Sequence, residues 1–199
     1  MAVQSDYRYS LTVNGATQFE VVRFVLKEHL STLFRLELDL ASFGSEPNFH
    51  SLIDQPATLT FWQGDEAVRS VNGIVTALNQ GETGFTRTRY HMVIEPSLCR
   101  AGLQTDLRIF QQQDSQKIIE TLLSKNQVPQ SQFHLQTPYW TREYCVQYRE
   151  TDLNFIQRLA AEEGSYYYFE HTNNSHILHF SNSTTLSEKK GNLVYNAMP

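Results

Sequence analysis

Cysteine and long apolar runs are both scarce in this chain of 199 residues. Its two cysteines, Cys99 and Cys145, are too few for the disulfide framework of a small secreted domain, so we expect both to be reduced. No stretch approaches the roughly 20 apolar residues that cross a bilayer, which argues against membrane insertion. The opening residues MAVQSDYRYS lack the features of a signal peptide, so we expect a protein made and kept in the cytoplasm.

An excess of positive charge is also missing. The chain has 16 Lys and Arg against 21 Asp and Glu, which gives a formal net charge of −5. These charges are scattered along the sequence, so no basic stripe can follow a phosphate backbone. We therefore expect no nucleic-acid partner.

Several motifs of common catalytic sites are absent from the sequence. There is no GxSxG nucleophile elbow and no glycine-rich phosphate loop. Neither cysteine lies in a recognised catalytic signature. These absences argue against nucleophilic hydrolysis and nucleotide chemistry.

The chain does have enough apolar material for a core, with 40% hydrophobic residues and 12% aromatics. In residues 34–40, apolar side chains alternate with charged ones, which indicates a strand with one buried face. Asn14-Gly15 favours a tight reversal and predicts an opening β-meander that continues into a first barrel or sandwich. The other strands predicted in this half are residues 7–13, 19–26, 57–62, 68–78 and 85–95.

The second half predicts two amphipathic helices, at residues 114–125 and 152–163. Asp114 and Thr151 are suitable N-caps, and Gly164 suits a left-handed C-terminal cap. Around the helices we expect an irregular stretch at 128–138, a short strand at 143–148 and a hairpin formed by 166–171 and 176–182.

Pro96 ends the first strand-rich stretch, because proline offers no donor to a strand ladder. We therefore predict a mainly β fold with a few helices, in two linked barrel-like subdomains. The first comprises residues 1–95, and the second comprises residues 96–182 with both helices. Residues 183–199 would then return toward the first subdomain.

One long motif carries a family resemblance. The stretch CVQYRETDLNFIQRLAAEEGSYYYFEH, residues 145–171, closely resembles the signature of VgrG proteins, the spike proteins of the type VI secretion system. The N-terminal region of this family is similar to the baseplate hub of contractile phage tails. Weaker matches follow the family's order: FRLELDLAS at 34–42, NGIV at 72–75, YHMVIEP at 90–96 and RIFQ at 108–111.

This resemblance implies a structural role with no cofactor. Three copies would form an adaptor between the hexameric Hcp tube and the needle, and the type VI machine would secrete the protein without a signal peptide. Two departures stand out. Residues 97–104, SLCRAGLQ, replace a tryptophan-rich stretch, and the sequence stops at Pro199 where family members continue into a neck and needle. We therefore expect the chain to be truncated.

Two groups of side chains invite chemical interpretations. The first group suggests general acid–base catalysis of the cleavage of a glycosidic bond. It consists of the acids Glu150, Asp152, Glu162 and Glu163. Helix capping and a solvated face are the stronger explanation, with Asp152 acting on the helix dipole. Acids in a last helical turn oppose the dipole, so Glu162 or Glu163 should have a partner such as an arginine.

The second group is formed by His171, His176 and His179, which suggest a metal site. His176 and His179 should point to opposite faces of one strand, so we favour solvated or hydrogen-bonded histidines. No catalytic, cofactor-binding or metal-binding residue is therefore predicted, and the protein is not expected to be an enzyme.

An aromatic strand leaves a further alternative open. Residues 166–169, YYYF, should send two aromatic side chains to each face, as in a strand covered on both sides, the second cover being a neighbouring subunit. The same strand, with the acid pairs, also suggests a glycan-binding or glycan-cleaving β-domain. A phage or phage-like tail baseplate hub is the closer alternative to a secretion spike.

Overall fold

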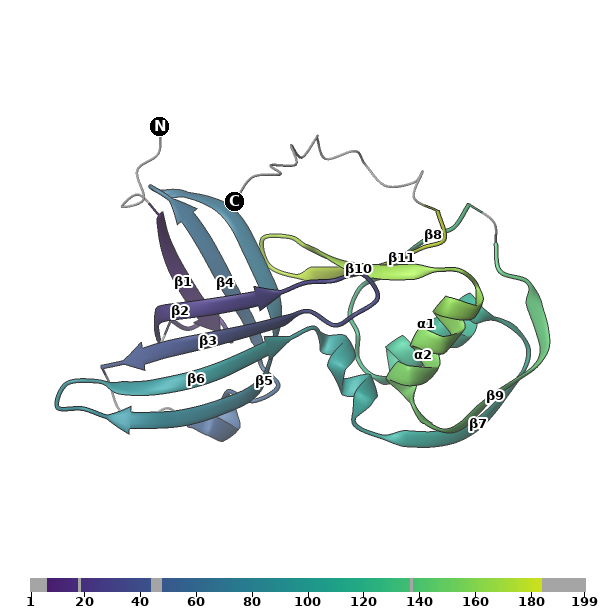
Figure 1. Ribbon diagram of the computed structural model, residues 1–199, viewed down its shortest axis with the longest axis horizontal. Coiled ribbons are helices and arrows are strands. Elements are labelled where there is room, and N and C mark those ends of the chain that lie inside the picture. The colour runs from purple at the N-terminus through teal and green to yellow at the C-terminus, as the bar shows by residue number, and fades with distance from the viewer. Residues whose placement is uncertain (1–6, 18, 44–47, 137, 184–199) are drawn as a thin grey trace, which may run out of the picture.

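The computed structural model describes residues 7–17, 19–43, 48–136 and 138–183, and most of these lie in β-strands (Figure 1). The first half forms one six-stranded sheet in the order β1-β4-β5-β6-β3-β2, which curls into a half-barrel. Its strands are β1 (Tyr7–Val13), β2 (Glu20–Lys27), β3 (Arg35–Ser42), β4 (Pro56–Gln63), β5 (Glu66–Thr83) and β6 (Thr88–Glu95). The prediction of a mainly β fold with few helices is confirmed.

The alternation in residues 34–40 fixes the inner face of this sheet. Phe34, Leu36, Leu38 and Leu40 are each at most 1% exposed, and all belong to the core enclosed by the sheet. Burying one such side chain contributes about 1.5–3 kcal/mol, so this strand alone supplies a large share of the core.

The predicted opening meander is wrong. The reversal at Asn14-Gly15 does form, with φ of 49° and 78°, and Val13 bridges to Ala16. However, β1 pairs with β4, and β2 pairs with β3. The local turn determines only that the chain reverses there. Which strands pair is determined by the curl of the sheet, which places β1 and β2 at its two edges.

The second half consists of two small sheets with two helices between them (Figure 1). One is a ribbon of β7 and β9, and the other has the order β10-β11-β8, with β8 parallel to β11. The elements in chain order are η3 (Ser97–Gly102), β7 (Thr105–Asp114), α1 (Ser115–Lys125), β8 (Ser131–His134), β9 (Thr141–Thr151), α2 (Asp152–Glu162), β10 (Tyr166–His171) and β11 (His176–Ser181).

Both predicted helices are confirmed to within a residue at each end. The Asp114 side chain accepts a hydrogen bond from the Lys117 backbone N–H at 2.8 Å, and Thr151 caps α2 in the same way. Gly164 has φ of 67°, as its C-terminal cap position requires. The apolar stripes of the helices meet in a second core, to which Leu159 contributes with 0% exposure.

Two predictions in this half need correction, and a third cannot be compared with the structure. The stretch 128–138 is not wholly irregular, because it contains β8, whose parallel partner β11 lies far along the chain. The strand expected at 143–148 runs from Thr141 to Thr151. The predicted return segment 183–199 lies, except for Ser183, outside the described residues.

The β10–β11 hairpin joins the two halves. Its turn docks on β5, where the Asn72 side-chain amide donates to the carbonyl oxygens of Thr172 and Ser175, at 2.7 and 2.9 Å. Phe34, on the half-barrel side, packs against the rings of Phe169 and His171 at centroid distances of 5.3 and 4.9 Å. The contacts between the halves are therefore both polar and apolar.

Leu159→Ala should lower the free energy of unfolding by about 2–5 kcal/mol, because it removes buried methyl groups and leaves a cavity in the second core. Leu103→Ala is the matched control, since Leu103 is 79% exposed and should cost far less. Urea unfolding of both variants measures the difference. Equal losses would show that the stripe of α2 does not face the core.

Candidate functional site

The acids singled out in the sequence are engaged in ion pairs. Arg142 contacts Glu162 and Glu163, both at 2.7 Å, and Arg158 contacts Glu150 at 2.6 Å and Glu162 at 2.8 Å. The arginine partners expected for the last turn of α2 are therefore Arg142 and Arg158. Burial raises the pKa of Glu162, but hydrogen bonds from both arginines outweigh it and leave the pKa lowered. A general acid at neutral pH needs the opposite shift.

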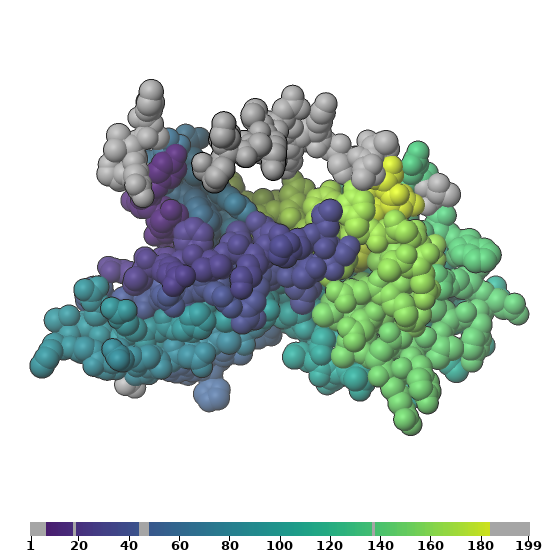
Figure 2. All heavy atoms as spheres, viewed as in Figure 1, coloured from purple at the N-terminus to yellow at the C-terminus, as the bar shows by residue number. Residues whose placement is uncertain are grey.

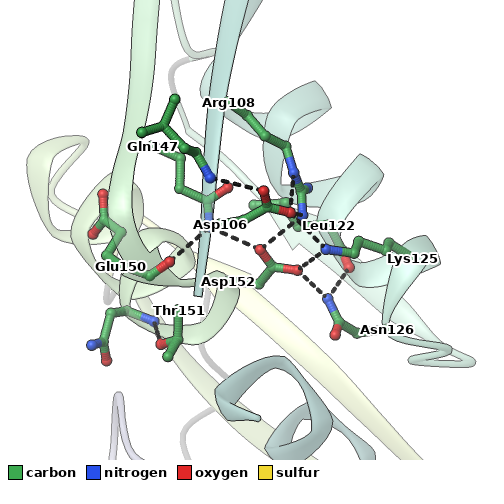
Figure 3. Close-up of polar contacts among 11 residues, drawn as sticks. Asp106, Arg108, Leu122, Lys125, Asn126, Gln147, Glu150, Thr151 and Asp152 are labelled. Atoms are coloured by element: carbon green, nitrogen blue, oxygen red, sulfur yellow. Dashed lines mark hydrogen bonds and ion pairs between the residues drawn. The ribbon is translucent and has the colours of Figure 1, made fainter. Parts of the chain in front are cut away.

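Asp152 lies at the centre of a buried polar network (Figure 3). Its side chain is only 3% exposed. One carboxylate oxygen accepts from Gln147 at 2.8 Å and Arg108 at 3.2 Å. The other accepts from Asn126 at 2.9 Å and pairs with Lys125 at 3.1 Å. These four donors come from β9, β7 and the C-terminal end of α1, so one carboxylate ties three elements to the start of α2.

A second carboxylate, Asp106, balances the charge of this network. It pairs with Arg108 and, at 3.2 Å, with Lys125. The hydrogen bond from Arg108, then that from the Leu107 backbone N–H, lowers the pKa of Asp106 to about 2. Burial raises the pKa of Asp152, but bonds from Gln147 and other donors outweigh it, so this pKa is lowered too. Both acids are ionised at neutral pH, which suits a structural network and not proton transfer.

The sequence-based interpretation of Asp152 as an acid that acts only on the helix dipole is therefore wrong. The network becomes recognisable once the strands are paired in the structure. Arg108 and Gln147 are directly opposite each other in the β7–β9 register, on the face of the ribbon that also carries Phe110 and Cys145. Two polar residues paired on an apolar face indicate a buried polar partner.

A cavity of about 450 Å³ lies beside this network, at the junction with the half-barrel. Its lining includes Ile74, Leu103, Cys99 and Arg100, together with Lys125 of the network. Burial raises the pKa of the Cys99 thiol to about 11, so the thiol stays protonated and is a poor nucleophile at neutral pH. Cys99 and Cys145 are both free, as expected for reduced cysteines.

Two of the hairpin histidines, His171 and His176, lie beside each other, with ring centroids 6.2 Å apart, and the third lies apart from them. His171 accepts a hydrogen bond from the Asn72 backbone N–H at 3.1 Å, and His176 lies 3.4 Å from the Ser97 hydroxyl. His179 instead contacts His134 at 2.8 Å. In the part of the chain that the structure describes, no three His, Cys, Asp or Glu residues form a group that could hold a metal ion.

Of the two alternatives expected for these histidines, solvated or hydrogen-bonded, burial favours the second. His176 and His179 are 6% and 4% exposed. Burial lowers the pKa of His176 to about 4, and it also lowers the pKa of His171, whose ring faces Glu28 at 3.5 Å. Both rings are therefore neutral at physiological pH, at the contact between the two halves of the molecule.

The aromatic strand β10 divides its side chains as predicted. Tyr167 is 1% exposed and, with Phe169, packs on the second core. Tyr166 and Tyr168 lie on the other face, stacked on each other, and Tyr168 stacks on His179 at 4.9 Å. These aromatic rings stack on one another in a row, an arrangement that accounts for them without a bound sugar.

The geometry defines a β-rich fold in which the conspicuous charged residues form ion pairs between its elements. Its fold is similar to that of the *Escherichia coli* c3393 protein, described as a type VI secretion component with structural similarity to the T4 tail proteins gp27 and gp5. The TM-score is 0.82 at 24% identity, over 90% of this chain and 50% of that chain.

The chain belongs to the phage tail baseplate hub (GPD) family, whose model matches residues 27–198. It is 38% identical over 98% of its length to the type VI secretion system spike protein VgrG2a of *Pseudomonas aeruginosa*. It is 41% identical over 83% of its length to the spike protein VgrG3 of *Vibrio cholerae*. The chain spans 24% and 16% of these two relatives. The resemblance to VgrG proteins predicted from residues 145–171 is confirmed.

Asp152→Asn should lower the free energy of unfolding by about 2–3 kcal/mol. This loss lies at or below the usual range for breaking a buried ion pair. The reason is that Arg108 and Lys125 keep Asp106 as a partner after the substitution. Asp114→Asn is the matched control at the N-cap of the other helix, where asparagine caps as well as aspartate and the loss should stay below about 0.5 kcal/mol. Denaturant titration compares the two. If Asp152→Asn lowers the free energy of unfolding by only tenths of a kcal/mol, the network contributes little to stability and Asp152 acts mainly on the helix dipole.

Stability should fall as pH drops from about 6.5 toward about 4. The folded pKa values of His171 and His176 are lowered, so in this window the unfolded chain binds protons that the folded chain does not. His176→Phe should flatten part of this dependence, whereas His29→Phe, at an exposed position, should not. Thermal unfolding at a series of pH values tests this, and an unchanged slope in His176→Phe would contradict it.

Proposed function

We propose that this chain is a structural hub component of a type VI secretion spike and performs no catalysis of its own. Family membership and the match to VgrG2a over 98% of the chain carry this proposal. The acids that suggested hydrolysis also support the proposal, because each of them pairs with a cation. They are Glu150, Asp152, Glu162 and Glu163.

In the proposed assembly, three copies form an adaptor between the hexameric Hcp tube and the needle. A three-fold hub meets a six-fold tube most simply if each chain presents two similar surfaces. We place the division between the two subdomains near Glu95. In support of it, the described apolar residues form two cores, one from Leu11 to Ile94 and one from Leu98 to Phe180.

The proposed role is mechanical. The hub is assembled in the cytoplasm and carried out of the cell with the needle when the machine contracts, without a signal peptide. Among the described helices, none has the length and apolar character needed to cross a membrane.

A phage or phage-like tail baseplate hub is the second candidate, and the description of the matching family favours it. The two candidates share one mechanism and differ in the machine that contains them. The genes beside this one distinguish them: secretion sheath and tube genes indicate a spike, and capsid genes indicate a phage.

Purified protein that carries this chain should be a trimer and should bind Hcp hexamers with one trimer per hexamer, as measured by light scattering after gel filtration. Glu150→Gln should bind equally well once folding is matched, because Glu150 pairs with Arg158 and does no chemistry. Glycan binding or hydrolysis that Glu150→Gln abolishes, without Hcp binding by the parent protein, would contradict the proposal.

A further inference from the structure

The β10–β11 hairpin is the part of the second half that reaches across to the half-barrel (Figure 1). Figure 2 shows the half-barrel strands on the left and the part after Pro96 mostly on the right, with the yellow-green hairpin extending over the half-barrel. His171 and His176 flank the turn of the hairpin and are directly opposite each other in its register. Both histidines therefore lie where the two halves of the molecule meet.

The contact between His171 and β5 requires an uncharged imidazole ring. The Nδ1 atom of His171 accepts a hydrogen bond from the Asn72 backbone N–H at 3.1 Å. A ring nitrogen that accepts a hydrogen bond carries a lone pair, so the single proton of the neutral ring is on Nε2. Protonation of the ring would place a second N–H on Nδ1, where it would face the N–H of Asn72. Two donors cannot bond to each other, so a charged His171 breaks this contact.

The surroundings of His176 are also unsuited to a charge. Its ring makes edge contacts with Phe34 and Phe169, at centroid distances of 5.9 and 5.8 Å. The polar atom beside its Nε2 is the uncharged hydroxyl oxygen of Ser97, at 3.4 Å. A buried group that ionises in such surroundings loses its hydration, and aromatic edges and one hydroxyl do not replace it.

The charged groups around the two histidines compensate little of this cost. Glu28, which follows β2, lies 3.5 Å from the Nε2 atom of His171, but its carboxylate is already paired with Arg69 of β5 at 2.6 Å. Burial, together with the charge of Arg69, lowers the pKa of His171, and Glu28 opposes this shift. Burial and the neighbouring His171 lower the pKa of His176 to about 4. The neutral form of both rings is therefore the form that fits the junction.

We propose that Asn72, His171 and His176 form an acid-operated latch, in which proton uptake by the two histidines releases the hairpin turn from β5. We call these three residues the hairpin latch. Both cores stay folded when it opens, because the buried apolar residues of each core come from its own half of the chain. The proposal goes beyond the hub role and does not depend on it.

Other contacts between the halves do not involve a histidine and limit the opening to the hairpin turn. Arg100 pairs with Asp54 at 2.8 Å, which ties η3 to the segment before β4. The Ser31 backbone N–H donates to the Tyr167 carbonyl oxygen at 2.8 Å, near the other end of β10. Acid therefore loosens the junction between the halves and does not separate them.

The pH window follows from the direction of the two pKa shifts. An unperturbed histidine has a pKa of about 6.5. Because both pKa values are lower in the docked state, the open state binds protons that the docked state does not. Docking is fully stable above about pH 6.5 and weakens as the pH falls toward the docked pKa values. One such histidine shifts the opening equilibrium about tenfold or more between about pH 7 and about pH 5.

Hydrogen exchange of single backbone amides, measured by NMR on the 199-residue chain, tests the latch directly. The Asn72 amide is the reporter, because its N–H bonds to the His171 ring. After correction for the intrinsic pH dependence of exchange, its protection should fall about tenfold or more from about pH 7 to about pH 5. The amides of Leu38 in β3 and Leu159 in α2 should keep their protection.

Two results of this experiment overturn the latch. Unchanged protection of the Asn72 amide shows that the hairpin turn stays docked in acid. An equal loss at Asn72, Leu38 and Leu159 shows that acid unfolds the whole chain and that no local opening precedes it. Neither result bears on the hub role, which is tested by trimer formation and Hcp binding.

A pair of histidine variants separates proton uptake from packing. His176→Phe keeps an aromatic ring against Phe34 but cannot take up a proton, so it should reduce the acid-induced loss of protection at Asn72 by about threefold or more. His50→Phe is the matched control, because His50 is exposed and lies outside the hairpin, and it should leave the loss unchanged. A loss in His176→Phe as large as in the parent chain overturns the proposal.

A pair of surface arginine variants keeps the latch testable if His176→Phe does not fold. Arg69→Gln frees the Glu28 carboxylate to pair with a protonated His171, so the acid-induced loss at the Asn72 amide should become smaller. Arg8→Gln is the matched control, since Arg8 also pairs with an acid and lies over an aromatic ring of β4, but away from the hairpin. Equal losses in the two arginine variants overturn the proposal.

Discussion

The arrangement of the second half of the chain depends on one buried carboxylate, that of Asp152. An ionised group that is 3% exposed persists only where several donors replace its lost hydration, and Asp152 receives them from Arg108, Lys125, Asn126 and Gln147. Each donor belongs to a different position on β7, β9 or α1. The carboxylate thus fixes the ribbon and both helices relative to one another, which apolar packing alone does less specifically.

This network also fixes the exposed face of the β7–β9 ribbon. The inner face of the ribbon carries Arg108 and Gln147, and the outer face carries Leu107 and Tyr148 one position away. Holding the inner residues in place therefore also fixes the outer ones. Under the proposed role as a hub, a rigid second half matters more than a reactive site. The ion pairs of Arg142 and Arg158 on α2 strengthen the same region.

The sequence predicted those features that depend on neighbouring residues. Side-chain spacing and turn chemistry are enough to predict three of these features. They are the alternation in residues 34–40, the helix caps at Asp114 and Thr151, and the β10–β11 hairpin. Features that depend on distant residues were missed: the pairing of β1 with β4, the parallel β8 strand and the surroundings of Asp152. Asp152 is a good first-turn acid in any helix, so its burial follows only from where β7 and α1 lie.

The most direct test of the structural role is an electron cryo-microscopy reconstruction of the protein that carries this chain, bound to the end of an Hcp tube. The account predicts three copies in a ring on the tube, with the Asp152 network intact within each chain. A chain that takes no part in a ring on the tube would contradict the hub role itself.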